Sequence, residues 1–140
     1  MYNLGTKIKK SQLNNLNIDS INSIEIIENN KNATSTMLAT CSDTDITLFN
    51  VSDQTKHSLY STPGSSKSKS NLDEISCLKA YHQNDLLFAS NSRHIMMFDL
   101  KEQKLVNKLK FNQETINCME FGSGVLTLGD DSGEIKIVDV

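Results

Sequence analysis

The sequence of 140 residues predicts an all-β protein built from three copies of one unit of short strands. A polar turn followed by an alternating apolar strand occurs three times, at residues 42–51, 91–100 and 129–140. Two further apolar segments of strand length precede each copy. The copies also return at a nearly constant spacing, which is typical of a repeat protein.

The first strand of each unit has one five-residue pattern: apolar, polar, small, apolar, charged. It occurs at residues 21–25, 75–79 and 116–120. The second apolar segments follow at residues 36–41, 86–90 and 124–128. Residues 57–61 and 104–111 fit a fourth, exposed outer strand. We therefore expect four-stranded antiparallel units, the fourth strand of the third unit falling beyond Val140.

The spacing of the units is close to 40 residues. Ile95 and Ile135 are 40 residues apart, and Ile75 and Ile116 are 41 apart. The first interval is longer because of two polar insertions, at residues 28–35 and 63–70. We expect both insertions to form surface loops that leave the strand pairing undisturbed.

Composition excludes several classes of protein. The net charge is −3 and the lysines are scattered, which disfavours a nucleic-acid binder. No apolar run approaches the roughly 20 residues that span a bilayer, and the first residues do not form a secretory signal. We expect a cytoplasmic or nuclear protein with no membrane contact. The three cysteines, without a CxxC pair, fit reduced and buried thiols better than a disulfide framework or a zinc site.

These patterns resemble WD40-repeat β-propellers over residues 21–140. Phe49-Asn50, Phe98-Asp99 and Val138-Asp139 stand where the family has Trp-Asp, and Asp43 and Asp131 match its turn aspartate. The chain has no Trp, and its second turn offers only Asn91 or Ser92. The structural repeat positions implied by the resemblance are Asp43, Phe49, Phe98, Asp99, Asp131, Val138 and Asp139.

The resemblance also implies a domain organisation. An N-terminal extension (1–20) precedes a partial propeller (21–140), with blades at about 21–62, 75–111 and 115–140 and a loop insertion at 62–73. Ile135 and Ile137 are expected on one face of the last strand, with Val138 and Val140 on the other. Three blades form an incomplete ring, because propellers close with four to eight. The remaining blades of a longer chain, or self-association, are expected to cover the open faces.

No reactive constellation stands out, and we expect no catalytic residue, metal or cofactor. The acidic turn residues fit tight hairpins better than metal ligation or paired-carboxylate catalysis; they are Asp43, Asp45, Asp130, Asp131 and Glu134. Cys77 and Cys118 occupy the same repeat position as Ser23, so all three are expected at crowded strand interfaces. The candidate regulatory serines, in the insertion, are Ser65, Ser66, Ser68 and Ser70.

The leading functional hypothesis is a non-enzymatic scaffold that binds other proteins through a rigid platform of blades. Within that class the chain is similar to WD-repeat substrate receptors of cullin-4 ubiquitin ligases. The docking arginine of that family would stand at Ser52, Lys101 and position 141. The alternatives are a truncated, non-functional propeller fragment and an enzyme built on a propeller.

Overall fold

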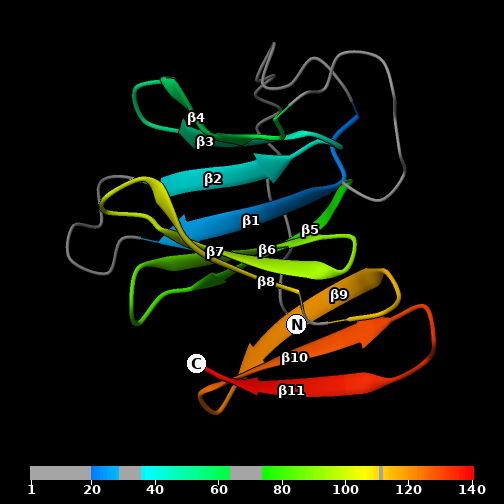
Figure 1. The fold of residues 1–140 in the computed structure, drawn as a ribbon. Coiled ribbons are helices and arrows are strands. Elements are labelled where there is room, and N and C mark those ends of the chain that lie inside the picture. The colour runs from blue at the N-terminus through cyan, green and yellow to red at the C-terminus, as the bar shows by residue number, and fades with distance from the viewer. Residues whose placement is uncertain (1–19, 29–35, 64–73, 111) are drawn as a thin grey trace, which may run out of the picture.

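The structure is a computed structural model that describes residues 20–28, 36–63, 74–110 and 112–140. The described residues form eleven strands and no helix, in three antiparallel sheets (Figure 1). The first sheet contains β1 (Ser23–Glu28), β2 (Thr36–Cys41), β3 (Asp45–Asn50) and β4 (Lys56–Ser61). The second contains β5 (Ile75–Tyr81), β6 (Leu86–Asn91), β7 (His94–Asp99) and β8 (Lys104–Lys110). The third contains β9 (Ile116–Gly122), β10 (Val125–Asp130) and β11 (Ile135–Asp139).

This architecture confirms the predicted all-β class and the incomplete set of propeller blades. Within each sheet the strands lie in chain order, each paired with the next. The third sheet has three strands among the described residues. The first strand of the second sheet, β5, packs against both β1 and β9, so each sheet runs outward from this inner edge.

Two apolar cores hold the three sheets together. The first lies between the first and second sheets and includes Leu48, Leu87 and Phe98. The second lies between the second and third sheets and includes Phe88 and Leu128. Successive side chains of a strand point to opposite faces, so Leu87 and Phe88 on β6 enter different cores. The second sheet is therefore buried on both faces, which explains its nearly continuous apolar strands.

The predicted outer strands are present, and a tight hairpin joins the first two strands of the third sheet. All seven residues of β8 are exposed, and the strand carries Lys104, Lys108 and Lys110, which protect an open sheet edge from unwanted pairing. Ser123 and Gly124 join β9 to β10 with φ angles of 52° and 83°. Two consecutive residues in this region are typical of a tight hairpin turn, where glycine is favoured.

Several predictions lie partly or wholly outside the described residues. They concern the N-terminal extension, the insertion before β2 and most of the insertion at 62–73. The first strand begins at Ser23, two residues later than expected, because Ile21 and Asn22 belong to the connection that meets the second sheet. The division of the chain into extension and blades remains a prediction.

Candidate functional site

Side chains of the first sheet hydrogen-bond the inner edge of the second. The amide of Leu78 donates to the hydroxyl oxygen of Ser23 (3.2 Å), and the amide of Ala80 donates to Oε1 of Glu25 (3.2 Å). Both amides belong to β5, the edge strand of its sheet. The two side chains therefore supply acceptors where no neighbouring strand does, and they fix the sheets relative to each other.

An ion-pair row crosses all three sheets at this inner edge. The Lys79 ammonium lies 3.4 Å from Glu25 of the first sheet and 3.2 Å from Glu120 of the third. Burial lowers the pKa of Lys79, but the hydrogen bond that Lys79 donates to Glu120 and the charges of both glutamates outweigh it and raise the pKa above its usual value. Lys79 is therefore a fixed cation between two acidic residues, and not a candidate general base.

The two predicted turn aspartates occupy equivalent places. The Asn22 side chain donates to Asp43 Oδ1 (2.9 Å), and the Asn117 side chain donates to Asp131 Oδ1. In the second unit the corresponding turn residue is Ser92, whose amide donates to a backbone carbonyl as that of Asp131 does. The asparagines that orient the two aspartates come from the start of each unit.

The apolar repeat positions differ in their surroundings. Phe98 is fully buried, and its ring makes an edge-to-face contact with Tyr60 of the first sheet, with the ring centroids 5.6 Å apart. Phe49 is buried beside Leu38 on β2. Val138 is half-buried against the second core.

The aspartates that follow these positions lie at the ends of strands. The Asp99 carboxylate accepts the amides of Lys101 (2.8 Å) and Glu102 (3.0 Å). These backbone hydrogen bonds, with nearby lysines, lower the pKa of Asp99. Asp139 ends β11, paired with Val125 of β10 and exposed. Asp99 therefore closes the turn between β7 and β8.

The most constrained carboxylate is Asp130, which no repeat pattern singled out. Its Oδ2 accepts from Asn112 (2.8 Å) and Lys136 (3.1 Å), and its Oδ1 accepts the amide and the hydroxyl of Ser132. The Ser132 hydrogen bonds and the Lys136 charge lower its pKa to about 2. It lines a hollow of about 410 Å³ with Glu134, Lys136 and others. With both oxygens occupied, Asp130 is a structural anion.

The cysteines are placed differently from one another. Burial raises the pKa of Cys41 to about 12 and raises that of Cys77, so both thiols stay protonated and are poor nucleophiles. Cys118 is exposed, which corrects the expectation that it faces a crowded interface. The reason is that its face of the third sheet has no sheet against it among the described residues.

No catalytic or metal centre is found in the part of the chain that the structure describes. No group of three His, Cys, Asp or Glu side chains there has the arrangement to hold a metal ion. Asp45, one of the turn carboxylates, accepts hydroxyls of Thr44 and Ser61. The regulatory serines of the insertion (Ser65, Ser66, Ser68 and Ser70) lie outside the described residues.

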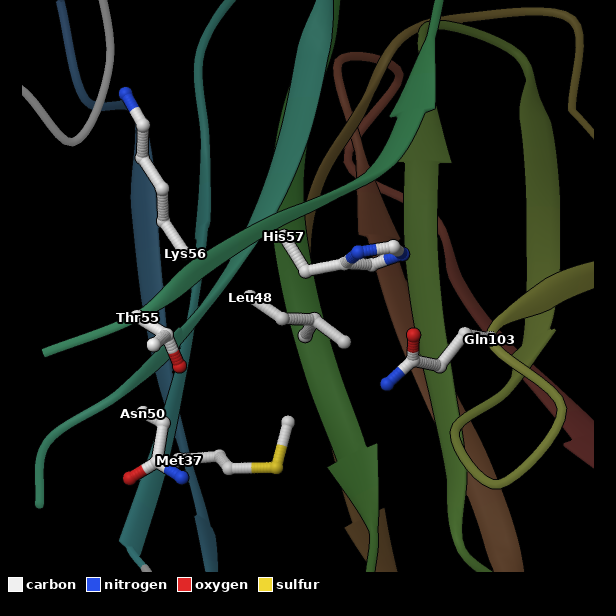
Figure 2. Close-up of a pocket in the computed structure, with 7 residues that line it drawn as sticks. All are labelled: Met37, Leu48, Asn50, Thr55, Lys56, His57 and Gln103. Atoms are coloured by element: carbon white, nitrogen blue, oxygen red, sulfur yellow. The ribbon is translucent and has the colours of Figure 1, made fainter. Parts of the chain in front are cut away.

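A second hollow, of about 340 Å³, lies at the outer rim between the first two sheets. Its lining residues are Met37, Leu48, Asn50, Thr55, Lys56, His57 and Gln103 (Figure 2). Met37 and Leu48 form an apolar floor. Figure 2 shows the Gln103 amide turned toward Leu48 from the turn before β8, whereas the Lys56 side chain runs away from the other residues. The hollow therefore has an apolar base and a hydrogen-bonding wall.

The ionisable groups in the lining of this hollow are few. His57 is its one imidazole, and no carboxylate or thiol stands among the lining residues. Thr55 donates its hydroxyl to Asp53 (2.6 Å), so that oxygen is already engaged. The arrangement suits binding of a side chain that inserts an apolar group and hydrogen-bonds at the rim. Sequence reasoning missed it because Met37 and Gln103 are far apart in the chain.

The described residues contain no helix long and apolar enough to cross a membrane.

No family model matches the chain, and no curated protein matches it by sequence. Among solved structures the chain is similar to one described as the crystal structure of the mitotic checkpoint complex. The TM-score is 0.62 and the identity 19%, over 74% of this chain and 31% of the matched chain. The chain thus spans under a third of that neighbour. At this identity the likeness concerns the fold, and it supports a propeller-like arrangement of the three sheets.

Proposed function

We propose that the chain is a divergent segment of a WD40-type propeller that acts as a non-enzymatic scaffold for other proteins. The observation that carries this proposal is the hollow at the outer rim between the first and second sheets. Its volume of about 340 Å³ accommodates one large side chain, and its mixed apolar and polar lining suits an anchor residue of a partner protein. The neighbour in a multiprotein complex is compatible with this role.

The surroundings of the hollow favour a partner with acidic residues near its anchor. Lys56 and His57 are exposed at its edge, and β8, with Lys104, Lys108 and Lys110, follows the same outer rim. Three apolar side chains of β8 are also exposed; they are Leu105, Val106 and Leu109. A basic and partly apolar rim attracts acidic segments and offers them surface to bury.

A photo-crosslinking amino acid at Gln103 tests this proposal inside cells that produce the protein. We expect covalent adducts with another protein, which the double variant Lys56→Glu, His57→Glu abolishes by placing two negative charges at the edge of the hollow. Glu114→Lys is the control, since it reverses an exposed charge that lies away from this hollow and its basic rim. Adducts that persist in the double variant, or none at Gln103, would refute binding at this hollow.

A finer form of the proposal makes the chain a substrate receptor or adaptor of a ubiquitin ligase. Lys101, at one position of the family's docking arginine, forms an ion pair with Asp85 (2.8 Å), so its charge is already partly used. Ubiquitylation of a captured partner that requires the intact rim would support this form. We propose a cytoplasmic or nuclear location for this activity.

The alternative of a propeller-based enzyme has no support in either hollow. The acidic residues that line the 410 Å³ hollow lie around Asp130, whose two carboxylate oxygens are both hydrogen-bonded. No acidic residue lines the 340 Å³ hollow at the outer rim. Hydrolysis of a small substrate that is lost in a folded Asp131→Ala variant would restore this alternative.

A further inference from the structure

The hollow at the outer rim is lined from both of the sheets that it separates. Met37 lies on β2, Leu48 on β3 and His57 on β4, all in the first sheet. Gln103 comes from the second sheet, in the turn between β7 and β8. In Figure 2 a thioether, an imidazole ring and an amide lie around the Leu48 side chain. A side chain that enters the hollow therefore meets all three kinds of group.

Two polar side chains of the lining are already engaged within their own turn. The Asn50 side chain donates to Asp53 (3.3 Å), and its oxygen accepts a backbone amide of the same turn (2.9 Å). The Thr55 hydroxyl donates to the same Asp53 carboxylate. The side chains of Gln103 and His57 make no hydrogen bond with other described residues. They are therefore the polar groups that a bound side chain can reach.

The charges in the lining favour an uncharged anchor. No carboxylate stands among the lining residues, so a lysine or arginine anchor would find no counter-ion there. The Lys56 side chain runs away from the other residues, so an aspartate or glutamate anchor would also lie unpaired (Figure 2). Removing a charge from water without a partner is costly. The acidic residues of a partner are thus expected beside its anchor, and not at the anchor position itself.

The shape and chemistry of the lining favour an aromatic ring over an aliphatic chain. The Met37 sulfur makes favourable contacts with aromatic rings, and the flat His57 imidazole offers a surface to a second ring. Leucine or phenylalanine would cover the Gln103 amide with apolar atoms and leave it without a hydrogen-bond partner. A phenolic hydroxyl both donates and accepts, so it can bond to either end of this amide.

We infer that the hollow selects a tyrosine side chain of the partner, with its ring against Met37 and its hydroxyl hydrogen-bonded to the Gln103 amide. This inference rests on the proposed function, because it names the anchor that the partner inserts at that hollow. Tryptophan fits less well, since its indole N–H donates but cannot accept. Gln103 is then the residue that distinguishes tyrosine from phenylalanine.

Gln103 can lose its amide with little risk to the fold. Its backbone φ is 51°, in the left-handed region where glycine is favoured over other residues. Gln103→Gly therefore keeps the turn and removes the hydrogen-bonding group. Gln54→Gly is the matched control, because Gln54 has a φ of 59° in the corresponding turn between β3 and β4 and does not line the hollow.

The test is a nuclear magnetic resonance titration of the 140-residue chain, isotope-labelled at its methionine methyl groups. The probes are the N-acetyl amides of tyrosine, phenylalanine, tryptophan and leucine. The Met37 methyl resonance, assigned by its loss in Met37→Leu, reports binding because an aromatic ring against the methyl group shifts it. Ligands of this size should bind with dissociation constants on the order of 1 mM.

We expect the tyrosine probe to bind about three- to tenfold more tightly than the phenylalanine probe, as one added hydrogen bond predicts. Gln103→Gly should reduce the affinity for tyrosine to that for phenylalanine, whereas Gln54→Gly should leave it unchanged. Equal binding of the tyrosine and phenylalanine probes overturns the inference. Tighter binding of the tryptophan or leucine probe, or a Met37 resonance that no probe shifts, also overturns it.

This titration and the crosslinking experiment can fail separately. Adducts at Gln103 in cells, without preference for the tyrosine probe, would support a partner at the hollow and refute tyrosine as its anchor. Preference for the tyrosine probe without adducts in cells would support the selectivity of the hollow and refute the proposed scaffold role at this place.

Discussion

Ile95 and Ile135 offer a direct measure of how much one sheet gains from the next. They are the same residue at the same repeat position, and they differ in coverage: Ile95 is 4% exposed beneath the third sheet, and Ile135 is 75% exposed. Truncation of each to alanine removes identical atoms, from the central strand β7 and from the edge strand β11 of the described sheets. Strand propensity spans about 1 kcal/mol, so a larger difference between the two variants reports packing between sheets.

The expected loss of stability in each variant follows from how far the isoleucine side chain is buried. Ile95→Ala leaves a cavity inside the second core, and such truncations cost about 2–5 kcal/mol. Ile135→Ala removes a side chain that keeps roughly a quarter of its burial, so its cost should stay below about 1 kcal/mol. We expect Ile95→Ala to lose at least about 1 kcal/mol more stability than Ile135→Ala, and its melting temperature should fall by several degrees more.

Urea unfolding followed by circular dichroism provides the assay, at two protein concentrations tenfold apart. An unchanged denaturant slope shows that both variants unfold from the same native structure. Equal costs for the two truncations would refute the assignment of Ile135 to an uncovered face. If those equal costs depended on concentration, a second copy would be covering that face.

The remaining predictions concern three local features. Asp130 has a pKa lowered to about 2, so its stabilising contribution is complete above about pH 4 and is lost as the pH falls toward 2. The Asp130→Asn variant should be less stable at neutral pH, and its free energy of unfolding should change less between pH 4 and pH 2. Lys79 has a raised pKa, so its contribution holds below about pH 10.5 and is lost above it. Double-mutant cycles should give Lys79 a larger coupling with Glu25, at most about 1 kcal/mol, than with Glu120, because the Glu25 side chain is 15% exposed and that of Glu120 69%. A Cβ at Gly129 would lie 2.8 Å from Cys118 Sγ, so Gly129→Ala should lower the melting temperature slightly. Adding Cys118→Ala in a double variant should restore the melting temperature. Additive effects of the two substitutions would argue against this contact.

The strands were predictable because their signals are local. Alternation along β11 and the polar turn before it specify a strand wherever they occur, and the spacing of Ile75 and Ile116 relates one unit to the next. The exposed outer strand β8 was predictable for the same reason, since lysines interrupt its apolar residues. Local pattern was thus sufficient for the order and pairing of the described strands.

The contacts between sheets were not predictable in this way. Nothing near Asn22 in sequence shows that its side chain meets Ile75, or that the Asn112 side chain reaches Asp130. These contacts depend on how whole sheets stack, which no pattern within a single unit encodes. The placement of Cys118 was wrong for the same reason: its repeat position predicts burial, but burial also requires a neighbouring sheet.

The first and third sheets show that a repeat position is buried only where a neighbouring sheet covers it. Ile21, Ile75 and Ile116 share one repeat position, yet Ile21 is 46% exposed and the other two are fully buried, because only the latter meet a preceding sheet. Ile135 shows the converse at the other end, where no following sheet is described. In such an array the free energy of folding is a sum of terms for each unit and for each contact between neighbouring units. Among the three sheets, the middle one is stabilised by two such contacts and each of the others by one. The exposure of an isoleucine at a repeat position therefore reports whether a sheet lies against it, and not a property of the residue itself.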